Sequence, residues 1–393
     1  MKQHLLEAES GVSQRRSTGT RPGLPTVGRP VPCFHGGAFF DAVGPGFDDL
    51  RRREGIINAD VLDAWFPPAP GVIQALQQHL PWLARTSPPA ACEGLLAALS
   101  GVRGVPAGCL VPGGGSSDLI FRALRLWLHP RSKVLLLDPT YGEYAHLLEQ
   151  VIGCAVARFP LQREEGFQVA PERFRRVVQR GFDWVILVNP NSPTGRHLPR
   201  RELVSLIAAA PASTRFWVDE TYVDYVGRAE SLETLAARNA QVVVCKSMSK
   251  VYALSGLRAA YLCAAPGVAA EVRSITPPWV MGLPAQVAAV KALEDEEYYA
   301  ARYAETHQLR QQLAQGLRAL GWHLHPGVAN FLLAELPPDG PDAATLVQRC
   351  RERGLFLRDA RCMGASLGRR SVRVAVKDAA SNRRMLGILR EVG

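Results

Sequence analysis

The chain has 393 residues, 47% of them hydrophobic and 21% charged, which is typical of a globular protein and excludes a disordered or fibrous one. The net charge of +10 comes mostly from scattered arginines, not from the short basic runs that mark nucleic-acid patches. No stretch approaches the ~20 apolar residues of a membrane span, and the N-terminus has no apolar signal region. We therefore expect a cytoplasmic protein without nucleic-acid or membrane partners. The eight cysteines form no CxxC pair, so we expect neither disulfides nor structural zinc.

The pattern of elements along the chain predicts an arm and two domains. Residues 1–32 are rich in Gly, Pro, Ser, Thr and Arg without periodicity, which predicts a flexible N-terminal arm. Over 71–280, short apolar runs alternate with amphipathic helical stretches, as in an α/β domain whose mainly parallel sheet is covered on both faces. From 281 to 393, a long helical pattern, short strands and a final helix predict a smaller α+β domain. The apolar runs in chain order are "KVLLLDP", "DWVILVNP", "RFWVDE" and "QVVVCKS".

Ligands of such sheets bind outside the carboxyl ends of the strands, so polar residues that follow strands are the candidates for a site. The segment 244–258, "VCKSMSKVYALSGLR", follows a strand and holds Lys246 and Lys250, two of only six lysines. A partly buried lysine can lose its proton and form a Schiff base, whereas arginine stays charged. The alternative for either lysine alone is a solvated charge, and Lys246 is interpreted as a flanking charge.

Three further segments point to an anion and a flat ring. The glycines and serines of "PGGGSSDLI" (112–120) precede a helix, where backbone N–H groups favour an anion, or form a glycine turn with a serine cap. Asp219, at the end of "RFWVD", offers a carboxylate for a protonated ring nitrogen or for a helix cap. Tyr141 of "DPTYGEY" is placed to stack on a ring or to pack in the core.

These signals occur together and in the same order in one known family. From about His35 to the C-terminus, the chain resembles fold-type-I pyridoxal-phosphate aminotransferases, in the branch of histidinol-phosphate aminotransferase and threonine-phosphate decarboxylase, through "SMSKVYALSGLR", "NPNSPTG" and "VDETYVDY". The resemblance implies an α/β fold with a seven-stranded-type sheet in the large domain and pyridoxal 5'-phosphate as cofactor. It also implies a homodimer, and a segment 33–70 that contributes to the small domain and to active-site closure.

Carried over by position, the resemblance implies a role for each motif residue. Lys250 becomes the Schiff-base lysine, Asp219 pairs with the pyridine nitrogen, Tyr222 reaches the phenolic oxygen and Tyr141 stacks on the ring. The cofactor phosphate falls to backbone and side chains of Gly115, Ser116, Ser247, Ser249 and Arg258.

The resemblance also implies substrate contacts. Arg373 matches the arginine that holds the substrate α-carboxylate, and Arg358 matches a second arginine that meets a phosphate or other distal anion. His35 of "FHGG" is a candidate substrate contact or a loop histidine. Ser192 stands where the family has an asparagine before "PTG", so either Ser192 or Asn191 contacts the phenolic oxygen, and we favour Asn191.

Two segments depart from the family pattern and bear on the substrate. "NADVLDAWFPPAP" (58–70) replaces an asparagine-rich element, and Trp65 and Phe66 suggest a reshaped pocket wall; "RTSPPAACEG" (85–94) lacks a tyrosine that reaches the partner subunit. We expect transamination of a small α-amino acid, with a phosphate or other anionic side chain as an option. Decarboxylation of an anionic amino acid is the alternative. A non-catalytic regulator is a remote one, since the arm is too short for a helix-turn-helix domain.

Overall fold

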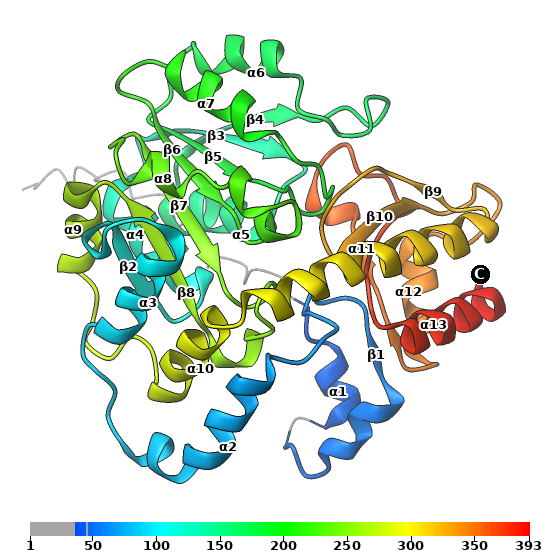
Figure 1. Ribbon diagram of the computed structural model, residues 1–393. Helices are drawn as coiled ribbons and strands as arrows, with labels where there is room; N and C mark the ends of the chain where they lie inside the picture. The colour runs from blue at the N-terminus through cyan, green and yellow to red at the C-terminus, as the bar shows by residue number, and fades with distance from the viewer. Residues whose placement is uncertain (1–35, 45) are drawn as a thin grey trace, which may run out of the picture. The chain divides into compact units, whose positions relative to one another are not determined.

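A seven-stranded sheet forms the centre of the fold, in the order β2-β8-β7-β6-β5-β3-β4 (Figure 1). The structure is a computed structural model that describes residues 36–44 and 46–393, so the predicted arm and His35 lie outside the described residues. β8 runs antiparallel to both neighbours and the other pairs are parallel, which confirms the predicted fold class. The strands are β2 (Leu110–Gly113), β3 (Lys133–Asp138), β4 (Ala155–Pro160), β5 (Trp184–Val188), β6 (Arg215–Asp219), β7 (Val242–Ser247) and β8 (Ala260–Ala264).

Successive side chains of these strands bury themselves in two separate apolar clusters, because strand residues alternate between the faces of a sheet. Val134 and Leu136 of β3 belong to one cluster with α4, η3 and α9, whereas Leu135 and Leu137 belong to the other with α3, α6, α7, α8 and α10. Both faces are therefore covered, as the all-apolar runs predict. The helices are α3 (Glu93–Arg103), α4 (Ser116–Trp127), α5 (Gly142–Ala145), the π-helix η3 (His146–Ile152), α6 (Pro171–Val178), α7 (Arg200–Ala208), α8 (Glu233–Ala236), α9 (Pro266–Ser274) and α10 (Leu283–Leu293).

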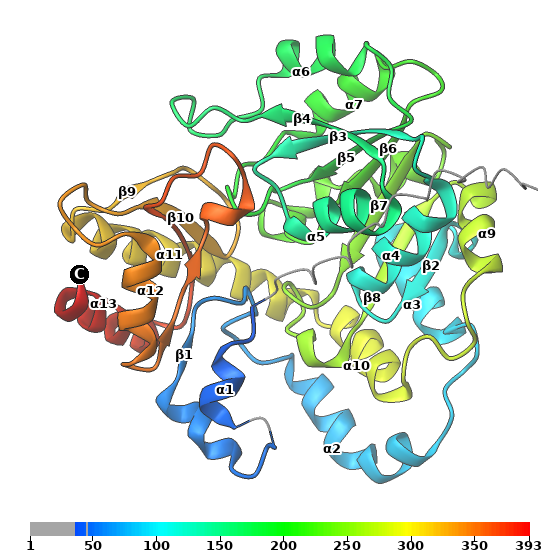
Figure 2. The same cartoon turned by 180° about the vertical axis from the view of Figure 1, so that it is seen from behind.

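The C-terminal part forms a second, four-stranded antiparallel sheet in the order β12-β13-β10-β9. The long helix α11 runs from α10 to this sheet, and α12 and α13 lie side by side (Figures 1 and 2). Near the N-terminal end, β1 pairs in parallel with β11. The domain boundaries and the contribution of 33–70 to the small domain stay predictions. These elements are α1 (Phe39–Val43), β1 (Ile57–Asn58), α2 (Pro70–Arg85), α11 (Glu296–Ala319), β9 (His323–Leu324), β10 (Phe331–Glu335), α12 (Ala343–Arg351), β11 (Leu355–Phe356), β12 (Arg358–Asp359), β13 (Ser371–Ala375) and α13 (Ala379–Val392).

None of the helices in the described residues has the length and apolarity needed to cross a membrane.

The interior of the large sheet domain contains charge, because β7 turns Lys246 inward. Its Nζ lies 2.9 Å from Asp224 Oδ2, 3.7 Å from Glu220 Oε2 and 4.0 Å from Glu233 Oε2, and its side chain is only 3% exposed. Lys246 is therefore a buried ion-pair partner, and its interpretation as a flanking charge is wrong.

Arg103 completes this buried cluster by lying 3.1 Å from Asp224 Oδ1. Burial favours the neutral form of Asp224, but Lys246 and Arg103 outweigh it and hold the pKa of this carboxyl well below its usual value. The cluster therefore fixes the loop after β6 to β7 and to α3 by charge.

Lys246→Ala is expected to destabilise the protein by about 3–5 kcal/mol, because it leaves buried carboxylates without their cation. Lys291→Ala is the matched control: Lys291 is 41% exposed and forms a surface ion pair with Glu294, so its loss is expected to change stability by no more than about 0.5 kcal/mol. Urea unfolding of the two variants measures the difference. Equal midpoints for both variants would show that the buried cluster carries no stability.

Candidate active site

A cavity of about 240 Å³ opens at the carboxyl edge of the parallel strands. Most of the side chains that the sequence singles out meet there, although they come from distant parts of the chain. Gly36, Val61, Leu62 and Ser192 complete much of its wall. The predicted residues that line it are Ser116, Tyr141, Asp219, Tyr222, Ser247, Ser249, Lys250, Arg258, Arg358 and Arg373.

One end of the cavity is built to hold an anion. Helix α4 begins at Ser116, so its free N–H groups and its dipole face the cavity end. Gly115 has φ of 99°, and a Cβ there would collide with the guanidinium of Arg258, so only glycine permits this approach. Arg258 Nη1 donates to the Ser255 carbonyl at 3.0 Å and lies 3.5 Å from Ser249 Oγ. Backbone N–H groups, hydroxyls and a guanidinium converge here, a donor set that fits a phosphate.

Asp219 supplies a buried carboxylate at the end of β6. Its Oδ2 accepts a hydrogen bond from Tyr144 Oη at 2.8 Å, and its Oδ1 accepts bonds from Thr221 N at 3.0 Å and Oγ1 at 2.6 Å. Burial raises the pKa of Asp219, while the bonds from Thr221 and Tyr144 oppose that rise. A cationic ring nitrogen beside it would stabilise the charged carboxylate. The contact of Tyr144 with Asp219 was not predicted, because no sequence pattern distinguishes Tyr144 from a tyrosine of the core.

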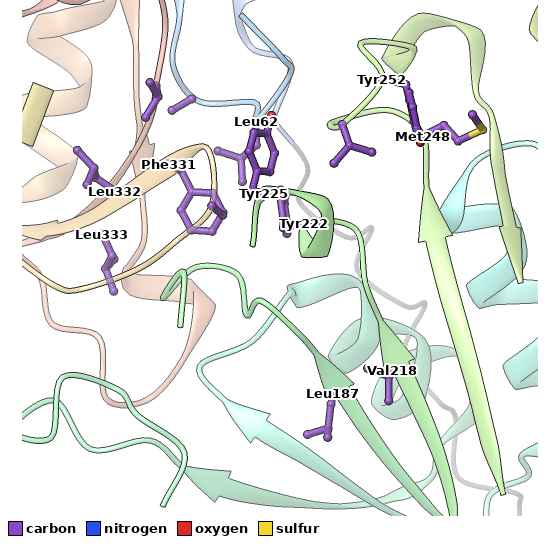
Figure 3. Close-up of a cluster of buried hydrophobic side chains, with 14 of the residues drawn as sticks. Leu62, Leu187, Val218, Tyr222, Tyr225, Met248, Tyr252, Phe331, Leu332 and Leu333 are labelled. Atoms are coloured by element: carbon purple, nitrogen blue, oxygen red, sulfur yellow. The ribbon is translucent and has the colours of Figure 1, made fainter. Parts of the chain in front are cut away.

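Two tyrosines from separate loops line the cavity. Tyr141 donates from Oη to Glu143 Oε2 at 2.7 Å. Tyr222 packs edge-on against Phe331, with ring centroids 5.4 Å apart, beside Leu62 (Figure 3). Burial raises the pKa of Tyr222 despite the nearby positive charge of Arg373. The phenol of Tyr222 therefore stays protonated and can donate a hydrogen bond.

The loop after β5 presents Ser192 to the cavity and turns Asn191 away. Asn191 Nδ2 donates to the Pro139 carbonyl and to Thr194 Oγ1, each at 3.0 Å, so its amide joins this loop to the loop after β3. Ser192 Oγ accepts from Arg373 Nη1 at 3.1 Å. The geometry contradicts the preference for Asn191, because that amide is satisfied outside the cavity wall.

Lys250 has an unexpected acidic partner. Its Nζ lies 2.6 Å from Asp63 Oδ1 and 3.4 Å from Ser255 Oγ. Burial lowers the pKa of Lys250, whereas Asp63 raises it and Arg258 and Arg373 lower it again. Lys377 Nζ lies 3.5 Å from the Asp63 carbonyl oxygen, and burial lowers the pKa of Lys377 to about 8. Asp63 was not predicted from the sequence, because it lies 187 residues from Lys250. The one available signal was an acidic residue in a segment expected to form an apolar wall.

Arg358 and Arg373 are Cα partners across β12 and β13, so the two cations stand side by side. Arg373 donates from Nη2 to the Asp60 carbonyl at 2.9 Å, and burial lowers its pKa to about 10. Among the described residues, its buried Nε has no hydrogen-bond partner, which leaves a donor for an incoming carboxylate. Arg358 instead lies against a carboxylate, with Nε 2.6 Å from Asp60 Oδ1.

The wall formed by the segment after β1 differs from the expectation. Val61 and Leu62 face the cavity. Trp65 donates from Nε1 to Thr306 Oγ1 of α11 at 2.8 Å, and the buried Phe66 packs among the tyrosine rings of α11. The proposal that Trp65 and Phe66 form the pocket wall is therefore wrong, because both anchor the segment to α11.

Known proteins resemble this chain over most of its length. Residues 86–389 match the family described as aminotransferase class I and II. Histidinol-phosphate aminotransferase 1 of Thiobacillus denitrificans is 30% identical over 358 residues, which cover 89% of this chain and 90% of that protein. Threonine-phosphate decarboxylase of Salmonella typhimurium is 30% identical over 296 residues, which cover 73% of this chain and 78% of that protein.

Solved structures share the fold. The histidinol-phosphate aminotransferase of Sinorhizobium meliloti, in complex with pyridoxal-5'-phosphate, superposes with a TM-score of 0.77 at 22% identity, over 85% of this chain and 91% of that one. The L-threonine-O-3-phosphate decarboxylase of Porphyromonas gingivalis gives a TM-score of 0.73 at 21% identity, over 86% of this chain and 99% of that one.

Asp63→Asn is expected to lower the pKa of Lys250 further, because a carboxylate beside an amine favours its charged form and the variant removes it. In cofactor-free protein, the pH midpoint for acylation of Lys250, followed by peptide mass spectrometry, should fall by about one unit. Asp359→Asn is the control, since Asp359 bonds to Arg361 outside the cavity wall, and it should leave the midpoint in place. An unchanged or higher midpoint in Asp63→Asn would contradict the coupling.

Proposed function

The chain belongs to the aminotransferase class I and II family and is a pyridoxal-phosphate-dependent enzyme, and from this premise we propose transfer of an amino group between an α-amino acid and a 2-oxo acid. One observation carries the proposal. The Lys250 amine shares a cavity with the Asp219 carboxylate, the anion site at Arg258 and the buried Arg373. The reaction needs these four functions close together.

The residues present fit the cofactor. Tyr141 would cover the ring, Asp219 would pair with its nitrogen, and Tyr222 and Ser192 would reach the phenolic oxygen. Bound pyridoxal phosphate supplies an aldehyde that takes up the amino group and a ring that withdraws electrons from the substrate. Its phosphate would be held by Gly115, Ser116, Ser247, Ser249 and Arg258.

The chain's own side chains divide the remaining work. Arg373 holds the substrate α-carboxylate, which fixes the α-carbon near Lys250. The Lys250 amine would hold the cofactor by its aldehyde and would serve as the base and acid that removes and returns the proton at the substrate α-carbon. Asp63, whose Oδ1 lies 2.6 Å from Lys250 Nζ, would keep this amine at the cavity.

Decarboxylation is the second candidate, and two observations favour it: a threonine-phosphate decarboxylase is among the relatives, and Arg358 stands in the cavity near Gly36. Incubation of the enzyme with single amino acids separates the reactions. Transamination converts the cofactor to pyridoxamine 5'-phosphate and releases a 2-oxo acid. Release of carbon dioxide without that conversion would overturn the proposed reaction.

Lys250→Ala is expected to abolish covalent capture of the cofactor. After borohydride reduction of wild-type enzyme, peptide mass spectrometry should find the cofactor on Lys250, and the variant should carry none and lose turnover by more than about a thousandfold. Lys291→Ala, on the exposed face of α10, should be labelled at Lys250 and remain active. Equal labelling of the Lys250→Ala protein at another lysine would refute the assignment.

A homodimer is part of the proposal and rests on the family resemblance together with exposed apolar side chains. Leu80 and Trp82 of α2 are 54% and 49% exposed, and Trp279 is 58% exposed, a pattern that suits burial against a second copy. Sedimentation should therefore give twice the 42.8 kDa mass of one chain. A mass of one chain at micromolar concentration would contradict the dimer. The cytoplasmic location stays a prediction of the same kind.

A further inference from the structure

The second arginine of the cavity is charge-compensated from inside the protein. Arg358 Nε lies 2.6 Å from Asp60 Oδ1, and the two side chains are 8% and 6% exposed, so this is a buried ion pair whose arginine lines the cavity. Solvent and salt screen a buried ion pair only weakly. The pair persists because either charge alone would be left uncompensated in a low dielectric. Arg358 is thus presented to a ligand as one half of a neutral unit.

Asp60 is fixed in place by the segment that carries it. The Asp60 carbonyl accepts from Arg373 Nη2 at 2.9 Å. On either side, Ala59 N donates to the Phe356 carbonyl at 2.9 Å, and Asn330 Nδ2 donates to the Leu62 carbonyl at 3.0 Å. These hydrogen bonds therefore hold in place the backbone that carries the Asp60 carboxylate.

Gly36 lies directly against the pair. A Cβ at this position would come within 2.7 Å of Asp60 Oδ2 and 2.8 Å of Arg358 Nη2, so a larger residue here would have to displace these side chains. The pair is consequently enclosed by backbone on one side and by the cavity on the other, which strengthens its electrostatic effect on anything in the cavity.

Among the described residues, the basic side chains that line the cavity leave only Arg358 for a distal phosphate. In the described part of the chain, the basic residues lining it are Lys250, Arg258, Arg358 and Arg373. Arg258 serves the cofactor phosphate, Arg373 the substrate α-carboxylate and Lys250 the reacting amine. A phosphate on the substrate side chain would have to bind Arg358. There the negative charge of the Asp60 carboxylate would repel it.

We propose, on the basis of the proposed function, that Asp60 is a specificity-determining residue that selects an α-amino acid with an uncharged polar end on its side chain and rejects phosphorylated ones. Val61 and Leu62 line the cavity beside Asp60 and suit an apolar stem. At its end, a hydroxyl or carboxamide both donates to the Asp60 carboxylate and accepts from the Arg358 guanidinium. A dianion offers no donor and repels the carboxylate.

The test compares substrates that differ only in a phosphate: L-homoserine with O-phospho-L-homoserine, and L-threonine with O-phospho-L-threonine, with L-glutamine as a carboxamide. For each, stopped-flow absorbance gives the specificity constant for conversion of the cofactor to its pyridoxamine form. Wild-type enzyme should prefer the uncharged member of each pair by about ten- to hundredfold, since one misplaced buried charge costs several kcal/mol. Equal or better use of the phosphorylated member would overturn the proposal.

Asp60→Asn keeps the shape and removes the charge, so it should shift the ratio toward the phosphorylated member by about ten- to hundredfold. The double variant Asp60→Asn with Arg358→Gln removes both charges of the pair and should lose that gain. Asp359→Asn, next to Arg358 but outside the cavity wall, should keep the wild-type ratio. An unchanged ratio in folded, cofactor-loaded Asp60→Asn would refute the role of Asp60.

The wild-type comparison decides the matter even if the Asp60 variants fail to fold. Failure of the proposed function gives a different result. In that case no amino acid, phosphorylated or not, converts the cofactor bound to Lys250, and the role of Asp60 is refuted together with transamination. Conversion by phosphorylated substrates alone leaves transamination standing and overturns only the role of Asp60.

Discussion

The site depends on the parallel pairing of β5, β6 and β7, which brings their carboxyl ends to one edge of the sheet. Val188, Asp219 and Cys245 are Cα partners across these strands, so the residues that follow them emerge side by side. Two of the three strands then deliver opposite charges to one cavity. Asp219 ends β6, and Lys250 follows β7 by three residues.

Short, local patterns made most of this predictable. The apolar runs predicted strands covered on both faces, and the resemblance placed Lys250, Asp219 and Arg258 because each belongs to a compact motif around a strand end. The direction of Asn191 was not predictable, since adjacent loop residues face opposite ways and only the partners Pro139 and Thr194 decide between them. Lys246 was misread for a related reason: its three carboxylates follow β6 or belong to α8, outside its own segment.

Contacts between distant segments were beyond the reach of those patterns. Asp60 and Asp63 stand in a stretch whose departure from the family was visible, but their partners lie in β12 and after β7. The sequence directed attention to the bulky Trp65 and Phe66 instead, which the structure uses to anchor the stretch to α11. In this stretch the chemically important residues are therefore Asp60 and Asp63, three positions apart. Asp60 pairs with Arg358 and Asp63 with Lys250.

The two lysines of β7 and its following loop show how environment assigns different roles to one residue type. Lys246 is 3% exposed and faces three carboxylates, so its charge is locked into the fold. Lys250 is 19% exposed and has Asp63 as its acidic partner. Burial, together with the nearby cations Arg258 and Arg373, lowers the pKa of Lys250, while Asp63 opposes this shift. An amine that is to serve as base and acid suits the second environment, because burial and nearby cations favour the neutral form of Lys250.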